Sequence, residues 1–138
     1  MSNPLEPLGL LIKRAQYRNH RALDVELVPL GISLVQWNAL REIHRNPGCS
    51  MHDLAELTFN SDQAFGALAK RLMRQGLVER RPSGGRATMH RLTPQGETLL
   101  NQATRIVSRV LVKLFAPLSK EERAVLTALL TKLLGQFS

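Results

Sequence analysis

Apolar residues recur every three or four positions along most of this chain, which places them on one face of a helix. The spacing predicts helices at 7–27, 34–44, 50–57, 62–75, 94–116 and 119–137. Two shorter segments, 77–81 and 88–92, instead alternate apolar and polar positions, which is typical of half-buried strands. The connection at 82–87 is short and contains adjacent glycines, so we predict that the two strands form a hairpin.

Residues at the helix boundaries support this assignment. Serine or threonine precedes most of the predicted helices, where a side-chain oxygen can accept a hydrogen bond from a free backbone N–H. Gly76 follows the helix at 62–75 and suits the left-handed backbone conformation that ends a helix. The predicted N-caps are Ser33 and Ser119, each in a capping box with Gln36 and Glu122 respectively, together with Ser50, Ser61 and Thr93.

The helices at 50–57 and 62–75 are joined by the short turn 58–60, which is the arrangement of a helix-turn-helix motif. Helix 62–75 has an apolar face and, opposite to it, a polar and basic face with small side chains in its first turns. A face of this kind can approach a DNA groove closely. With the hairpin that follows as a basic wing, the segment from Ser50 to Leu92 predicts a winged helix-turn-helix.

Three further runs of sequence make a resemblance specific. They are Gly76-Leu77-Val78-Glu79-Arg80, the wing end Gly85-Arg86-Ala87, and Leu92-Thr93-Pro94-Gln95-Gly96. With these runs the chain resembles the MarR family of bacterial transcription regulators over nearly its whole length. The runs Gly31-Ile32-Ser33-Leu34-Val35-Gln36-Trp37 and Leu118-Ser119-Lys120-Glu121-Glu122-Arg123 resemble the starts of the family's second and last helices.

The resemblance implies a mainly α fold: a three-helix core with a two-stranded wing, and dimerisation helices at both ends. It places the DNA-binding lobe at 33–92 and the dimerisation helices at 7–30 and 94–138, within one MarR-like domain spanning 1–138. The terminal helices also carry more apolar surface than one subunit needs, which independently favours a homodimer. The implied function is a repressor that binds a pseudo-palindromic operator in double-stranded DNA and is released by a small-molecule effector.

Composition is consistent with this interpretation. The chain has 138 residues and a mass of 15.4 kDa, which favours one domain. Its net charge of +8 and pI near 10.8 indicate a polyanionic partner, either nucleic acid or an anionic membrane surface. No apolar run is long enough to span a membrane and no signal peptide is recognisable, so we expect a cytoplasmic protein without a membrane partner.

Roles for individual residues follow from their place on the motif. Gln63 and Ala67, early on the outward face of helix 62–75, are expected to reach base edges, and Lys70, Arg74 and Arg80 to meet phosphates. By resemblance, Arg86 at the tip of the wing enters the neighbouring minor groove. The full predicted DNA-binding set is Ser61, Gln63, Gly66, Ala67, Lys70, Arg71, Arg74, Arg80 and Arg86, and the predicted effector-pocket residues are Tyr17, Trp37 and Arg41.

Other functions have less support. No nucleophile–base–acid set, phosphate loop or dinucleotide fingerprint occurs at a usable spacing, so we expect no enzyme and no cofactor. His44, Cys49 and His52 are close in sequence but lack the paired spacing of a zinc site, so we expect no metal, and Cys49 is interpreted as a packed, inert thiol. His20 and His90 are interpreted as ordinary surface or hairpin residues, Trp37 alternatively as a core residue, and the basic side of the first helix as a solvated face. The remaining alternative is a winged module that binds nucleic acid nonspecifically or binds an acidic protein.

Overall fold

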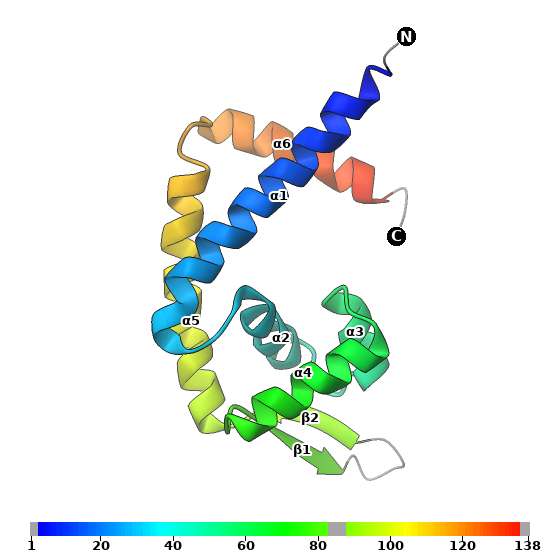
Figure 1. Cartoon of the computed structure of the whole chain (residues 1–138), viewed down its shortest axis with the longest axis vertical. Coiled ribbons are helices and arrows are strands. Elements are labelled where there is room, and N and C mark those ends of the chain that lie inside the picture. Colours follow the sequence, from blue (N-terminus) through cyan, green and yellow to red (C-terminus); the bar gives the residue numbers. More distant parts are fainter. Residues whose placement is uncertain (1–2, 83–87, 136–138) are drawn as a thin grey trace.

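The computed structural model describes residues 3–82 and 88–135 of the chain. This part is mainly helical and contains one two-stranded antiparallel sheet (Figure 1), so the predicted fold class is confirmed. The elements in chain order are α1 (Leu5–Leu27), the short 3-10 helix η1 (Val28–Leu30), α2 (Leu34–Arg45), α3 (Met51–Leu57), α4 (Asp62–Arg74), β1 (Val78–Pro82), β2 (Thr88–Leu92), α5 (Pro94–Leu114) and α6 (Lys120–Gly135).

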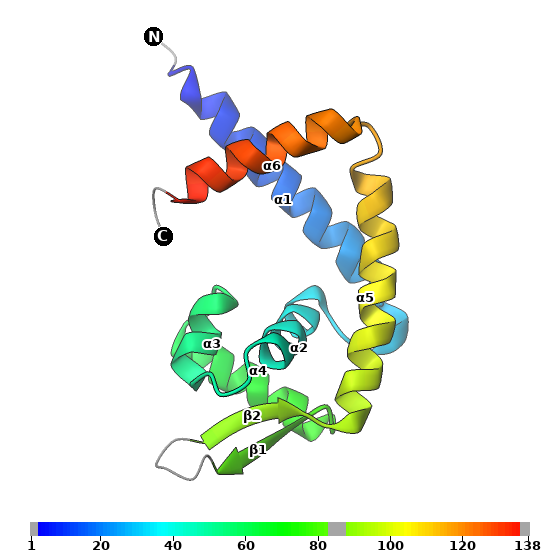
Figure 2. The ribbon, with the colours of Figure 1, turned by 180° about the vertical axis from the view of Figure 1, so that it is seen from behind.

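The elements α2, α3, α4 and the β1–β2 hairpin gather at one end of the molecule and form what we call the winged lobe. Helices α1 and α5 extend away from this lobe and pack against each other (Figure 1). Figure 2 shows α6 turning away from the far end of α5. No residue of α6 is buried, so this helix contributes an exposed surface rather than a core.

Most helix starts are stabilised by the predicted side-chain caps. Ser33 Oγ accepts a hydrogen bond from Gln36 N at 3.1 Å, and Gln36 Oε1 accepts one from Ser33 N at 2.9 Å, which completes the capping box. The same pair of bonds joins Ser119 and Glu122 at 2.9 and 3.1 Å. These bonds confirm both predicted capping boxes. Capping boxes can be predicted from sequence because the two residues that form them are only three positions apart. Ser50, Ser61 and Thr93 cap their helices with a single bond each, the side-chain oxygen accepting from the backbone N–H three residues later.

Several boundaries differ from the prediction by a residue or two. Helix α1 begins at Leu5, before Pro7, because Asn3 Oδ1 accepts a hydrogen bond from Leu5 N at 2.9 Å. Helix α5 ends at Leu114 rather than near residue 116, and β1 spans 78–82 rather than 77–81. Gly76 has a φ of 75°, as its predicted role in ending α4 requires. The predicted end of the last helix, at residue 137, lies outside the described residues.

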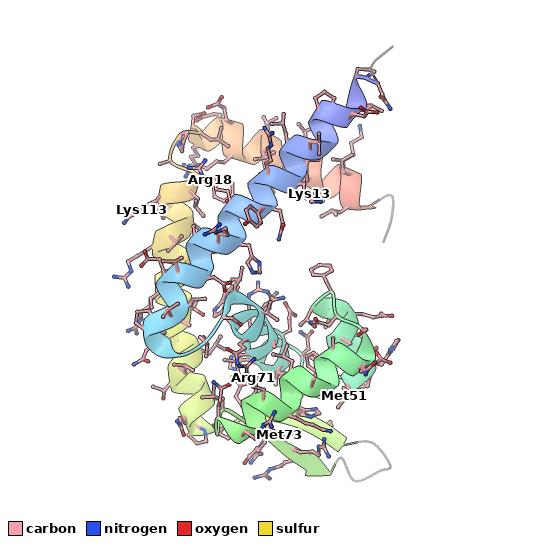
Figure 3. The ribbon with its side chains drawn as sticks, in the orientation of Figure 1. Lys13, Arg18, Met51, Arg71, Met73 and Lys113 are labelled. Atoms are coloured by element: carbon pink, nitrogen blue, oxygen red, sulfur yellow. The ribbon has the colours of Figure 1, made fainter. Side chains whose placement is uncertain are left out.

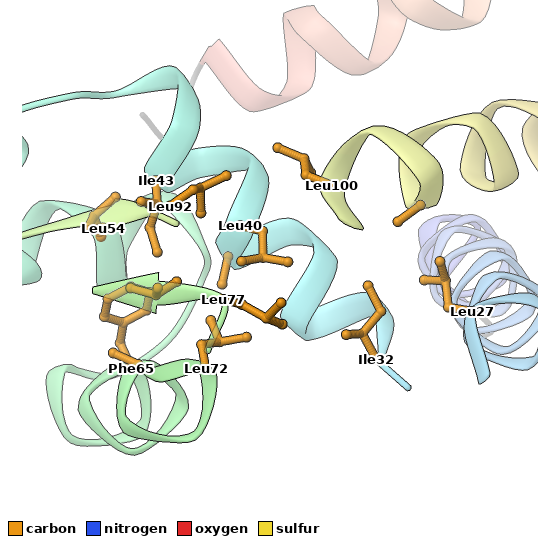
Figure 4. Packing of buried hydrophobic residues seen from close by; sticks show 14 of the residues in the cluster. Leu27, Ile32, Leu40, Ile43, Leu54, Phe65, Leu72, Leu77, Leu92 and Leu100 are labelled. Carbon is orange, nitrogen blue, oxygen red and sulfur yellow. The ribbon is translucent and has the colours of Figure 1, made fainter. Parts of the chain in front are cut away.

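One hydrophobic core joins the winged lobe to the bases of the two long helices. Figure 4 shows Phe65 and Leu72 of α4 facing Leu40 of α2, with Leu27 and Leu100 at the other end of the same cluster. Phe65, Leu27, Leu40 and Leu72 are completely buried. The winged lobe is therefore held to α1 and α5 by continuous apolar packing.

One expectation from the helical spacing is wrong in detail. Leu54 and Leu57 recur at helical spacing in the segment 50–57, which would place both on one apolar face, but Leu57 is 42% exposed whereas Leu54 is 1% exposed. Helix α3 packs on α2 and α4 through its buried residues Leu54 and Ala55. Leu57 is the last residue of this seven-residue helix and is not buried in the contact. Trp37 is half-buried and packs against the core, which agrees with its alternative interpretation as a core residue, and its indole N–H donates to Thr104 Oγ1 at 3.2 Å.

Candidate nucleic-acid interface

The turn between α3 and α4 is fixed by its own hydrogen bonds. Thr58 Oγ1 donates to Leu54 O at 2.8 Å, and Asn60 Nδ2 donates to Thr58 Oγ1 at 2.9 Å. Asn60 N closes the turn by donating to Ala55 O at 2.9 Å. Phe59 adopts a φ of 60°, which is uncommon for a residue with a large side chain. These contacts set the angle at which α4 leaves α3, and this angle determines how α4 can approach a groove.

Helix α4 is divided into a buried and an exposed face. Phe65, Ala69 and Leu72 are buried against the lobe. Gly66 is half-buried, and a Cβ added there would lie 3.9 Å from Met51 Sδ, so its closest neighbour is α3. The other predicted DNA-binding residues of this helix are all exposed, as their outward role requires: Ser61, Gln63, Ala67, Lys70, Arg71 and Arg74.

The cations on this exposed face are not neutralised within the protein. In the part of the chain that the structure describes, Lys70, Arg71, Arg74 and Arg80 form no ion pair with an acidic side chain. Figure 3 shows Arg71 on α4 well separated from Lys13 and Arg18, which project from α1. The unpaired cations of α4 and β1 lie in the winged lobe, where they can attract a polyanion. Among the described residues Lys13 and Arg18 of α1 also form no ion pair.

The wing pairs in the register Val78↔Leu92, Glu79↔Arg91, Arg80↔His90, Arg81↔Met89 and Pro82↔Thr88. Val78 and Leu92 are buried and anchor the hairpin to the core. On the opposite face Glu79 forms ion pairs with Arg91 and, at 3.5 Å, with Arg81. Arg80 remains exposed and unpaired among the described residues. Arg86, the predicted wing-tip residue, lies outside the described residues.

His90 is a buried residue rather than an ordinary hairpin residue. It is 5% exposed, and neither ring nitrogen has a hydrogen-bond partner in the described part of the chain. Burial, with a smaller contribution from the charge of Arg80, lowers the pKa of His90 below its ordinary value. The strand alternation could have identified this burial, because residues 90 and 92 point to the same side of β2 and Leu92 is apolar.

His52 connects the two helices of the motif, which sequence spacing did not reveal. Its Nδ1 lies 2.9 Å from Asp62 Oδ1, in the first turn of α4, and its Nε2 lies 3.2 Å from Glu56 Oε1. The hydrogen bond with Asp62, the charge of Asp62 and the charge of Glu56 raise the pKa of His52. Only the contact with Glu56, one helical turn away, could have been expected from the sequence.

A second polar connection holds the other end of α4. The buried Gln36 of α2 donates from Nε2 to Gln75 Oε1 at 2.9 Å, and Gln75 Nε2 donates to Gly31 O at 3.4 Å. Gln36 was identified in the sequence only as part of a capping box. The structure shows that its carbonyl caps α2 while its amide group binds the end of α4.

The three predicted effector-pocket residues are not all brought together. The Arg41 guanidinium lies 5.9 Å from the centroid of the Trp37 ring, so these two residues form one cation–π pair on α2. Tyr17 on α1 instead contacts Arg21, whose guanidinium lies 5.8 Å from its ring centroid and 3.3 Å from its hydroxyl oxygen. Trp37 and Arg41 therefore remain together as candidates, and Tyr17 belongs to a separate contact.

Two further features of the described ranges 3–82 and 88–135 concern metal ions and membranes. These ranges contain no group of three or more His, Cys, Asp or Glu side chains arranged to hold a metal ion. None of their helices is both long and apolar enough to cross a membrane. Cys49 is half-buried and packs against the hydrophobic core.

Comparison with known proteins identifies the family. A profile described as MarR family matches residues 30–87. An HTH-type transcriptional repressor of Mycobacterium tuberculosis is 32% identical over 129 residues, covering 89% of this chain and 93% of the relative. The multiple antibiotic resistance protein MarR of Escherichia coli is 30% identical over 135 residues, covering 96% and 94%.

Solved structures agree with the sequence comparison. A mutant of Escherichia coli MarR in complex with operator DNA matches with a TM-score of 0.87 at 28% identity, over 96% of this chain and 99% of that one. The Mycobacterium tuberculosis MarR family protein in complex with p-aminosalicylic acid matches with a TM-score of 0.77 at 28% identity, over 92% and 98%. Together with the winged helix-turn-helix geometry, these similarities show that the chain belongs to the MarR family of transcription regulators.

Proposed function

We propose that this protein is a homodimeric repressor that binds a pseudo-palindromic operator through α4 and is released by a small-molecule ligand. The observation that carries the proposal is the exposed face of α4, which combines unpaired cations with small side chains in its first turns. Such a face fits the major groove of DNA closely. The similar Escherichia coli structure in complex with operator DNA supports the same assignment.

The exposed face of α4 separates into two kinds of contact. Gln63 and Ala67 lie early on the helix, where recognition-helix residues reach base edges, so Gln63 is proposed to bridge an adenine and Ala67 to contact a thymine methyl group. Lys70 and Arg74 lie later on the same helix and Arg80 lies on β1, and these side chains are proposed to bind phosphates. Arg86 is proposed to enter the adjacent minor groove.

A second subunit explains the surface that one chain leaves open. The protein exposes 10100 Å² of accessible surface, whereas a compact monomer of this mass exposes about 7,200 Å². The excess comes with apolar side chains on the two terminal helices, since no residue of α6 is buried, Leu126 alone of its described residues being half-buried, and the first half of α1 is exposed throughout. The exposed apolar residues of these helices include Leu5, Leu8, Leu10, Leu11, Ile12, Val125, Leu129, Leu130, Leu133 and Leu134. We propose that a second copy of the chain covers them.

The decisive experiment is recovery and sequencing of the fragments that the protein retains from its own genomic DNA. The affinity for an enriched duplex is then compared with that for a scrambled duplex at one fixed salt concentration. A specific regulator binds the enriched duplex at least about a thousandfold more tightly. Equal affinities would leave only the electrostatic attraction shared by all sequences and would establish the nonspecific winged module instead.

The effector is proposed to be an aromatic carboxylate bound near Trp37 and Arg41. Their cation–π pair offers an aromatic face and a guanidinium at one place on α2, and this guanidinium also pairs with Glu42 at 2.8 Å. The relative's complex with p-aminosalicylic acid supports this ligand class. Because binding linkage is reciprocal, a ligand that releases DNA must bind the DNA complex less tightly than the free protein. Titration of the free protein and of its DNA complex with salicylate measures both affinities, and equal values would contradict the mechanism.

A further inference from the structure

His52 lies between carboxylates that come from both helices of the motif. On α4 it meets Asp62, with Nδ1 at 2.9 and 3.2 Å from the two carboxylate oxygens. On its own helix it meets Glu56 at 3.2 Å, and Asp53 acts on it at longer range. All the charged groups that face His52 from α3 and α4 are therefore acidic, and their combined field favours the imidazolium form.

The position of Asp62 makes this cluster relevant to DNA. Asp62 is the first residue of α4 and is exposed, so it lies beside Gln63 at the end of the recognition helix that approaches the groove. An unmasked carboxylate there repels the phosphates of DNA. A protonated His52 pairs with this carboxylate and also connects the first turn of α4 to α3.

We propose that His52 is a positioning residue of the DNA-binding site, which in its protonated form holds the first turn of α4 and masks Asp62, so that DNA binding takes up a proton at His52 in each subunit. The inference rests on the proposed function, because it assigns a role within the α3–α4 interface with DNA. His52 acts through Asp62 and Glu56 and does not itself read a base.

The direction of the pH effect follows from linkage. The surrounding carboxylates hold the pKa of His52 above its ordinary value of 6.5 in the free protein. Phosphates brought near the cluster raise this pKa further, so the complex binds a proton that the free protein has begun to lose. Between the two pKa values, affinity falls as the pH rises, by up to about tenfold per pH unit for each subunit. Below the pKa of His52 in the free protein, His52 is protonated both in the free protein and in the DNA complex. In that range the affinity for DNA no longer depends on the protonation of His52.

The charge state of the cluster can be measured without DNA. Nuclear magnetic resonance titration of the histidine ring protons gives the pKa of His52 in the parent and in Asp62→Asn, which keeps the side-chain size but removes the charge. We expect the substitution to lower the pKa of His52, because Asp62 is the largest contributor to the raised value. An unchanged pKa would show that the two side chains do not pair in solution and would overturn the inference.

Binding is then measured from about pH 6 to 8.5 at constant ionic strength, since salt alone changes DNA affinity. The probes are a duplex enriched from genomic DNA and a random-sequence duplex of about 30 base pairs, each long enough for one dimer footprint. His52→Gln should lose the pH dependence and bind at low pH as weakly as the parent binds at high pH. His52→Lys, which stays charged, should keep the low-pH affinity of the parent up to high pH.

A matched control is His20→Gln. His20 also forms an ion pair with a carboxylate four residues away, Asp24 at 3.4 Å, but it lies on α1, outside the helix-turn-helix motif. We expect this variant to keep the parental pH dependence. If His52→Gln keeps the parental slope, or if His52→Lys is as weak as His52→Gln at every pH, His52 does not act by its charge and the inference is wrong.

The two claims fail in distinguishable ways. If the parent binds neither duplex at low salt and low pH, the proposed DNA-binding function itself has failed. If the parent binds DNA but His52→Gln does not change the pH dependence of the DNA affinity, the proposed function stands and only the role of His52 is withdrawn.

Discussion

Replacing Gly96 with alanine tests how tightly α5 is joined to the wing. Gly96 is buried in the first turn of α5, where its N–H donates to the Thr93 cap at 3.0 Å. Thr93 N in turn donates to Leu77 O at 3.0 Å, and Thr93 Oγ1 donates to Gly76 O at 2.7 Å. This turn of α5 is thus held directly against the backbone of the segment that leads into β1.

The expected loss of unfolding free energy follows from the space available for a side chain at residue 96. A Cβ at Gly96 would lie 2.0 Å from Leu77 O and 2.9 Å from Leu77 C, so one of the two backbone segments must move by more than an ångström. Overpacking of this kind costs about 1–3 kcal/mol, and loss of the Thr93 bond to Leu77 adds about 1 kcal/mol. Helix propensity acts the other way and offers at most about 1 kcal/mol for alanine over glycine. We therefore expect a net destabilisation of about 1–3 kcal/mol.

The assay is thermal and urea unfolding at one fixed protein concentration, because the stability of an oligomer depends on concentration. For a chain of this length the loss of about 1–3 kcal/mol corresponds to a fall in Tm of about 3–10 °C. Gly66→Ala is the matched control, since it is also a helical glycine but its new Cβ would meet only Met51 Sδ at 3.9 Å. This control should be neutral or more stable than the parent. A Gly96→Ala protein as stable as the Gly66→Ala protein would refute the reasoning.

Three further predictions concern the wing, the subunit contact and base recognition. The pKa of His90 is lowered in the folded protein, so the unfolded chain protonates this side chain more readily and the stability falls as the pH drops through about 6.5. His90→Leu should therefore reduce the difference in unfolding free energy between about pH 7.5 and 5.5. An unchanged difference would show that other groups cause the pH dependence of the stability. Replacing both Leu126 and Leu130 with glutamate should dissociate or unfold the dimer, because an unpaired buried charge costs several kcal/mol; sedimentation at micromolar concentration measures this, and a monomeric parent would contradict the proposed dimer. Gln63→Ala should relax preference at one base position by about 1–3 kcal/mol, whereas Lys70→Ala should weaken all sequences alike and reduce the salt slope by about one unit; a uniform loss for Gln63→Ala in binding assays would place its contact on the phosphates.

Sequence patterns predicted the features that depend on near neighbours. Both capping boxes, the left-handed Gly76 and the wing pairing follow from spacings of a few residues, and the structure confirms them. The exposed face of α4 was also predictable, because helical periodicity fixes which residues share a side. These local rules define the fold class and the surface offered to a partner.

The polar connections between elements could not be predicted in this way. The bond between Gln36 and Gln75 joins residues 39 positions apart, and Asp62 is ten positions from His52. Such contacts depend on the angle between helices, which a hydrophobic pattern does not specify. Leu57 is more exposed than the pattern indicated for the same reason, since burial depends on where the neighbouring helix ends.

The continuous core means that the winged lobe cannot be cut out as a separate piece. A fragment of residues 33–92 would lack Leu23, Leu27, Ile32, Leu100, Ala103 and Val107, all of which are buried in the same cluster. Each large apolar side chain contributes about 1.5–3 kcal/mol when fully buried, so their joint removal approaches the whole stability of a small domain, about 5–15 kcal/mol. Grafting the DNA-reading surface onto another protein would therefore require transferring the ends of α1 and α5 as well.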